Sequence, residues 1–141
     1  MTMRDERGAA ATELALLVPG FMLLLALMVA GGRIWLARGA VSEAAAAGAR
    51  AATLQRSAGE AEVAAGRVID ANLASASLVC VDRTVSVDTT GFAKAPGIPA
   101  VVTVSVSCTV ALSDVLLPGM PGNVSASAVG SSALDTFRGR R

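Results

Sequence analysis

Residues 8–32 read GAAATELALLVPGFMLLLALMVAGG, and this stretch decides how the chain is built. Glu13 stands directly before a run of 19 uncharged residues, Leu14 to Gly32, which is long enough to cross the roughly 30 Å hydrocarbon core of a bilayer as a helix. A carboxylate at the head of such a run opposes insertion, by about 3 kcal/mol at the bilayer centre and less near the interface. Membrane anchors and secretory signals have no use for this acid. Glu13 is therefore a candidate functional residue.

The residues around Glu13 resemble a type IV pilin-like signal. In such a signal a prepilin peptidase cuts after a glycine and leaves a glutamate as the fifth residue of the mature chain, which here places the cut between Gly8 and Ala9. The leader, residues 1–8, carries two basic and two acidic residues, unlike the net-positive start of a secretory signal. The run RGAAATELALLVP is similar to the start of TadE-like and TadG-like pseudopilins of tight-adherence (Flp) pilus systems. Residues 116–119 and 124–128 extend the likeness along the chain.

This resemblance implies a structural role in pilus assembly, for adhesion or a related secretion machine. Ala9 would supply the new amino terminus, and Glu13 would be its counter-charge. The implied partners are the prepilin peptidase, other pilins or pseudopilins, the assembly platform and membrane lipid. The implied location is the bacterial cell membrane or the pilus, with the N-terminus in the cytoplasm and the C-terminal domain outside.

The first element that we predict is a helix from about residue 10 to residue 54, because alanine, leucine, valine and methionine dominate that stretch. Residues 9–36 are the predicted transmembrane helix, with Arg33 and Trp35 as interface anchors at its end. Basic residues flank the span on both sides, so their distribution does not settle the orientation. Only the resemblance and the exported character of the remaining chain favour a cytoplasmic N-terminus.

Pro19 lies inside the predicted span and lacks the N–H that a helix needs there. One interpretation is a tolerated membrane proline. The other, which follows from the resemblance, is a kink that allows the helix to leave the bilayer and pack with neighbours.

Small residues dominate the helix after the membrane, from Ala37 to Ala52. Small residues spaced by four allow helices to approach each other closely. The simpler interpretation, which we favour, is that this strip covers the sheet of its own domain. The alternative is that it also packs on neighbouring subunits.

Residues 37–141 should form one extracytoplasmic α+β domain, which is small enough to depend on a partner for stability. Ser57 and Glu60 have the spacing of a capping box, which predicts a second, short helix with a core-facing apolar stripe. That stripe comprises Ala61, Ala65, Val68, Ile69, Leu73 and Ala76. Valines then alternate with polar residues over 79–87 and 102–112, which predicts two antiparallel strands joined by a loop rather than a tight hairpin. Residues 124–129 predict a weaker third strand, in a sheet of three or four.

The two cysteines, Cys80 and Cys108, are a candidate disulfide, because an isolated pair in a small exported domain is more often bonded than free. Cys108 shares the phase of the valines in its strand, whereas Cys80 is out of phase with Val79 and Val81. A bond therefore requires Cys80 to lie before the regular pairing or at a bulge.

Composition argues against catalysis and against nucleic-acid binding. The chain has 12 basic and 11 acidic residues, no histidine and no tyrosine, so it lacks a basic stripe and the commonest general base and zinc ligand. The aspartates have no metal-ligand spacing, and no nucleophile or phosphate-binding motif is present. We therefore expect no enzyme activity, no cofactor and no metal. The alternative to a pseudopilin is an uncleaved single-span anchor that carries a small extracellular binding module, but it leaves Gly8 and Glu13 unexplained.

Overall fold

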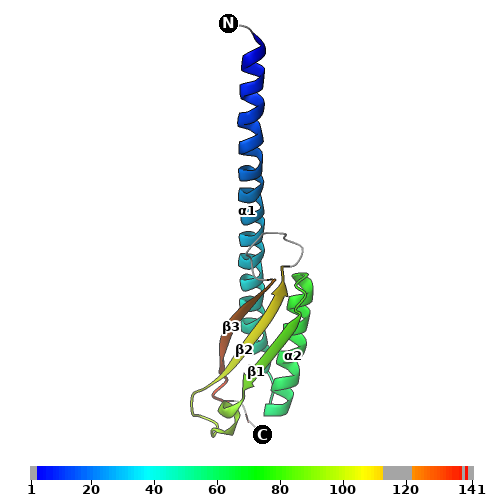
Figure 1. The fold of residues 1–141 in the computed structure, drawn as a ribbon. Helices are drawn as coiled ribbons and strands as arrows, with labels where there is room; N and C mark the ends of the chain where they lie inside the picture. The colour runs from blue at the N-terminus through cyan, green and yellow to red at the C-terminus, as the bar shows by residue number, and fades with distance from the viewer. Residues whose placement is uncertain (1–2, 113–121, 138, 140–141) are drawn as a thin grey trace.

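The computed structural model describes residues 3–112, 122–137 and 139, with side chains from Glu13 onward. Its elements follow the chain in the order α1 (Met3–Thr53), α2 (Ala58–Ser75), β1 (Asp82–Asp88), the 3₁₀ helix η1 (Thr90–Ala93), β2 (Ala100–Ala111) and β3 (Asn123–Leu134). Figure 1 shows α1 extending far beyond the rest of the molecule, with α2 and the sheet gathered around its C-terminal part. The predicted α+β architecture is confirmed.

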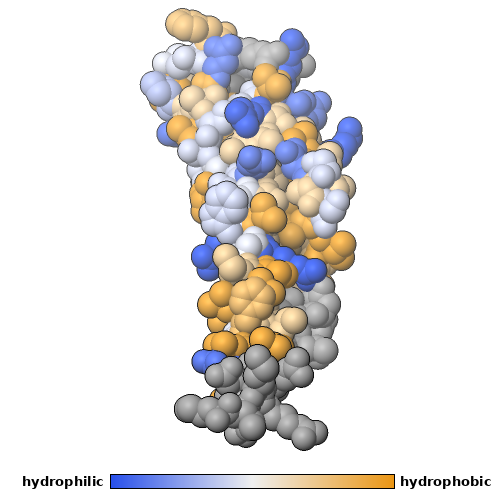
Figure 2. Space-filling model, turned by 90° about the horizontal axis from the view of Figure 1, so that it is seen from above, coloured by the Kyte–Doolittle hydropathy of each residue, from blue (hydrophilic) through white to orange (hydrophobic). Residues whose placement is uncertain are grey.

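The N-terminal half of α1 is apolar and exposed. From Glu13 to Thr53 it is the one helix, among the described residues, that is long and apolar enough to cross a membrane, with a mean hydropathy of 2.5 over an 18-residue window. Large side chains of this segment are open to the surroundings, among them Leu16 at 81% and Met28 at 69%. In the space-filling view hydrophobic residues gather in the lower half of the picture, with most hydrophilic residues above them (Figure 2). The chain therefore fits a single-pass membrane protein.

The capping signal marks the start of α2. Ser57 is the N-cap residue in extended conformation, and its hydroxyl accepts a hydrogen bond from the backbone N–H of Glu60 at 3.3 Å. This bond satisfies one of the backbone donors that a helix start leaves open. The buried residues of α2 are Ala61, Ala65, Ile69 and Leu73, all from the predicted stripe. The stripe ends one turn earlier than predicted, since Ala76 is the exposed C-cap residue.

The three strands form one antiparallel sheet in the order β1-β2-β3. β2 lies in the centre, and its alternate residues Val102, Val104, Val106 and Cys108 are fully buried under the helices. The connection from β1 to β2 was predicted as a plain loop, but it contains η1, whose Phe92 is buried against the core. An aromatic side chain there closes the end of the core away from the span.

The strand boundaries differ from the prediction, by one or two residues in β2 and by more in the other two strands. The first strand begins at Asp82, so Val79 and Val81 precede it and are 80% and 64% exposed. The third strand, predicted as short and weak, continues to Leu134 and is as long as β2. Its serines, alanines and glycine have low strand propensity, but pairing along the whole of β2 and packing under α1 override that preference.

The small residues of α1 allow the helix to lie almost in contact with the backbone of the sheet. A Cβ atom added to Gly130 in β3 would be 2.4 Å from the carbonyl carbon and oxygen of Ala45. On another side of α1, a Cβ atom on Gly48 would be 2.8 Å from the Ile69 side chain of α2. The strip is therefore used by its own domain, which is the interpretation that we favoured from the sequence.

We predict that Gly130→Ala destabilises the domain, because the new methyl group meets backbone atoms that cannot rotate away. Separating α1 from β3 should lower the free energy of unfolding by about 1 to 3 kcal/mol. The matched control is Gly66→Ala in α2, where a Cβ atom meets nothing within 4 Å. Alanine in that helix interior should raise stability by about 0.5 to 1 kcal/mol. Urea unfolding of the full chain in mild detergent, followed by circular dichroism, measures both changes. Equal stability of the two variants would contradict the close-packing argument.

Candidate functional site

The residues of the predicted pilin-like signal lie along the N-terminal part of α1. The helical backbone is continuous through Gly8 and Ala9 and onward past Glu13. The Glu13 side chain is exposed and has no ion-pair partner among the side chains that the structure describes. Within the part of the chain whose side chains are described, nothing neutralises this carboxylate at the head of the apolar segment.

Pro19 lies inside α1, six residues after Glu13. The helix continues on both sides of it, so the missing N–H leaves one backbone carbonyl without its helical donor but does not end the helix. In the span the carbonyl has no water to accept from. The structure holds the proline within a continuous helix, and the predicted kink during assembly stays a prediction.

Arg33 and Trp35 lie at the C-terminal end of the apolar segment, where α1 enters the domain. The indole of Trp35 is 75% exposed, and the first residue of α1 buried in the domain core cluster is Val41, less than two turns later. The aromatic and basic side chains thus lie between the exposed apolar helix and the packed domain. That is where interface anchors are expected in a single-span protein.

Cys80 and Cys108 form a disulfide with their Cα atoms 5.3 Å apart. In the sheet the register partner of Cys108 is Arg83, so Cys80 reaches it from the segment before β1. This is one of the two positions that the phase mismatch in the sequence required. The backbone N–H of Val81 donates to the carbonyl of Thr109 at 2.7 Å, which holds the same segment against the end of β2.

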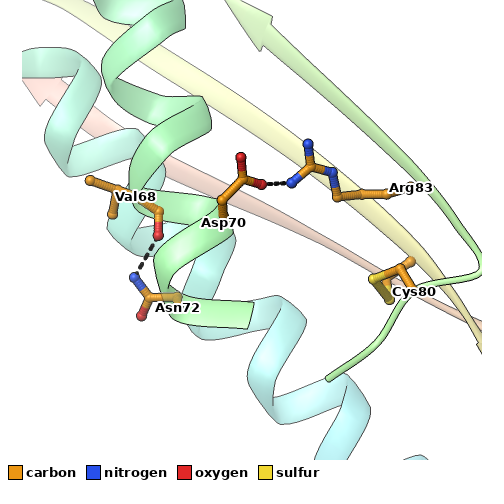
Figure 3. Close-up of polar contacts among 6 residues, drawn as sticks. Val68, Asp70, Asn72, Cys80 and Arg83 are labelled. Carbon is orange, nitrogen blue, oxygen red and sulfur yellow. Dashed lines mark hydrogen bonds and ion pairs between the residues drawn. A yellow bond between two sulfur atoms is a disulfide. The ribbon is translucent and has the colours of Figure 1, made fainter. Parts of the chain in front are cut away.

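An ion pair joins α2 to β1 near the disulfide. Figure 3 shows the Arg83 guanidinium turned toward the Asp70 carboxylate of α2, with the bonded Cys80 beyond it. Asn72 donates its side-chain amide to the carbonyl of Val68 at 2.8 Å, within α2 itself. Because both charged side chains are partly exposed, the pair contributes little stability and mainly fixes how α2 lies over β1.

The remaining carboxylates are dispersed. Among the described residues no three metal-ligating side chains lie together. Asp88 accepts hydrogen bonds from the hydroxyl and the backbone N–H of Thr90, which lower the pKa of its carboxyl and join the end of β1 to the start of η1. Asp114 lies outside the described residues. Asp88 therefore has a structural role at the end of β1.

The sequence did not reveal a broad groove at the membrane-proximal end of the domain. It has a volume of about 1230 Å³ and is lined by α1 from Arg33 to Glu43, by the segment after α2, and by Val110 and Ala111 at the end of β2. Three segments far apart in the chain build it, so no local pattern could predict it. The exposed Val79 and Val81 belong to its wall, and we had assigned both to a half-buried strand.

Residues 8–50 match the family model described as TadE-like protein. The N-terminal region of this chain is therefore similar to TadE-like proteins. The match begins at Gly8 and includes Glu13, Pro19 and the apolar segment, and it ends near the C-terminus of α1. It does not reach α2 or the sheet. Residues 116–119, part of the likeness that we noted in the sequence, lie outside the described residues. No curated protein and no solved structure matched the chain.

We predict that the disulfide forms in the exported protein and stabilises it. A bond that closes 28 residues should raise the free energy of unfolding by about 3 to 4 kcal/mol through the entropy of the unfolded chain. Mass measurement of the full chain without reductant should give two hydrogens fewer than after reduction, and alkylation without reductant should label neither thiol. The double variant Cys80→Ala and Cys108→Ala should unfold at a lower urea concentration. Two freely labelled thiols in the native chain would contradict the bond.

Proposed function

We propose that the chain is a structural, pseudopilin-like subunit that acts in assembly of a Tad-type (Flp) pilus, for adhesion or a related secretion machine, and has no enzymatic role. The observation that carries this proposal is Gly8 followed by Glu13 at the head of an exposed, membrane-length apolar helix, inside the TadE-like region. The partners in this proposal are a prepilin peptidase, other pilins or pseudopilins and the assembly platform. The N-terminus is cytoplasmic and the domain lies outside.

Cleavage after Gly8 would change the electrostatics of Glu13. In the uncut chain Glu13 lies inside α1, ten residues from the helix start. After the cut Ala9 becomes the first residue, so the carboxylate is close to the new helix N-terminus and to a positive amine. A negative side chain is favoured there by about 0.3 to 1 kcal/mol from the helix dipole, in addition to the attraction of the amine. Processing thus gives the acid a favourable environment.

Assembly would supply the rest of the compensation. An ionised carboxylate at the head of the span is unfavourable while the subunit stands alone in lipid, because desolvation opposes it. A neighbouring subunit that brings its own Ala9 amine within a few ångströms removes that penalty. Glu13 therefore favours association over dispersal in the membrane. Pro19, with one helical hydrogen bond already lost, would be the place where the helix bends as it packs.

The domain is suited to move with the helix. α1 contacts α2, β2 and β3, and the backbone approach at Ala45 and Gly130 leaves no space between helix and sheet. A displacement of the span would be transmitted to the sheet as a rigid unit, because packed interiors are not easily deformed. A subunit drawn out of the membrane would carry its domain with it.

We predict that Gly8→Val retains the leader while the chain still inserts in the membrane. The peptidase requires a residue without a side chain before the cut, and valine adds a branched one. The matched control is Gly31→Val, at a position in the span where an added Cβ atom meets nothing within 4 Å. That control should still lose residues 1–8. Amino-terminal sequencing of the membrane fraction reads both outcomes. Removal of residues 1–8 from the Gly8 variant would rule out Gly8 as the cleavage position.

We predict that Glu13→Ala inserts at least as well as the wild type and is still cut, yet fails to join its pilin partners. The control is Glu62→Ala, an exposed carboxylate on α2 that should change none of these properties. Cleavage, membrane level and co-purification with the other pilins are measured in the same cells. Wild-type association in the Glu13 variant would favour the alternative, an uncleaved anchor with a small extracellular binding module.

A further inference from the structure

The segment between α2 and β1 displays two valines at the membrane-proximal end of the domain. Val79 and Val81 are 80% and 64% exposed, although each flanks a cysteine that is packed against the core. Successive side chains of an extended segment point to opposite sides. Because the disulfide directs Cys80 inward to Cys108, it directs both valines outward. The bond thus fixes an apolar pair in an exposed position, where folding alone gains nothing from it.

These valines line the same groove as the part of α1 that directly follows the apolar segment. They line one wall of the 1230 Å³ groove, and α1 from Arg33 to Glu43 lines the other. At about 1.5 Å per residue, Arg38 is about 7 to 8 Å further along the helix than Arg33. The headgroup layer on one side of a bilayer is about 5 to 8 Å thick. A span that ends at Gly32 therefore places the part of the groove from Arg33 to Arg38 within that layer.

The groove has the chemistry of a lipid interface. Its rim is apolar at Trp35, Val79 and Val81, while Arg33 and Arg38 place positive charge on the same wall of α1. Glu43, the acidic residue of the lining, lies about 15 Å beyond Arg33 and therefore on the water side of the headgroups. Basic side chains near a membrane surface attract anionic lipids by about 1 kcal/mol each. Apolar and basic side chains are thus found together at the end of the groove next to the span, and the acidic side chain lies further from it.

We propose that this groove is a lipid-binding surface that seats the domain on the outer leaflet, with an anionic phospholipid headgroup against the arginines and its upper acyl chain against Trp35, Val79 and Val81. The inference rests on the proposed membrane span but not on a role in a pilus. A second copy of the chain is the competing occupant, and the experiment separates the two.

The test uses the full chain in phospholipid vesicles and its one tryptophan, Trp35. In the first variant Trp35→Phe is combined with Val79→Trp, which places the indole on the valine segment. In the matched control Trp35→Phe is combined with Val129→Trp, at a 68% exposed position of β3 on the sheet face opposite the helices. Lipids brominated near the headgroup end of the acyl chain quench an indole that touches them. We expect strong quenching of the wild type and the Val79 variant, and none of the Val129 variant.

Lipid selectivity tests the arginines. Vesicles of phosphatidylcholine and phosphatidylglycerol are prepared with either one or the other brominated, and the ratio of the two quenching values reports which lipid surrounds Trp35. The wild type should favour the anionic lipid. Arg38→Gln should reduce this preference by up to about fivefold, whereas Glu43→Gln should not reduce it.

Each outcome has a defined meaning. Quenching of Trp35 but not of the Val79 variant would overturn the proposal of a lipid-binding groove, but it would agree with the proposed membrane span. If the indole of the Val79 variant is protected from quenching by the brominated lipids only at a high protein-to-lipid ratio, a second copy of the chain occupies the groove. That outcome would overturn the proposal. Absence of quenching at Trp35 itself would instead refute the membrane placement on which the proposed function depends. Circular dichroism, together with mass measurement of the intact disulfide, verifies that each variant is folded.

Discussion

The structure depends on one helix whose first half is suited to lipid and whose second half packs against a sheet. In lipid every backbone N–H and carbonyl must be paired within the segment, and a helix is the way a single span achieves this. The same helix continues into the domain, where it has to lie against a sheet. It does so with small side chains, so that the Gly130 Cα comes close to the Ala45 backbone. Larger residues in the second half would keep the helix but push the sheet away.

A second constraint acts at the junction between the span and the domain. The disulfide ties the segment before β1 to the end of β2, next to the place where α1 leaves its apolar part. Without that bond, Val79 and Val81 could turn toward the core and reduce their exposure, since both are apolar. The exposed valines and the disulfide are therefore one feature. The ion pair between Asp70 and Arg83 joins α2 to β1 directly after that segment.

Sequence reasoning succeeded where one residue type has one dominant use. The apolar run, the Ser57 cap and the bonded cysteines each follow from local chemistry, and the likeness around Gly8 and Glu13 agrees with the family match. Sequence reasoning failed where one pattern of residues fits more than one arrangement of the chain. Alternation across Val79 and Val81 indicates extended chain but does not say whether the chain is paired or which side faces the core. β3 was underestimated because its small residues are weak strand formers, and their value appears only in contact with α1.

The two proposals act on the subunit in opposite directions. Glu13 makes the isolated span unfavourable in lipid, so it favours departure from the membrane or association within it. The apolar rim with Trp35, Val79 and Val81 favours contact with the membrane surface, because leaving it exposes apolar area to water at about 25 cal/mol per Å². A subunit that leaves the bilayer must therefore exchange lipid for protein at both levels, at the head of the span and at the rim of the domain. Neighbours that cover only the helix would leave the valine rim in water, so a stable assembly outside the membrane requires a partner surface at the disulfide end as well.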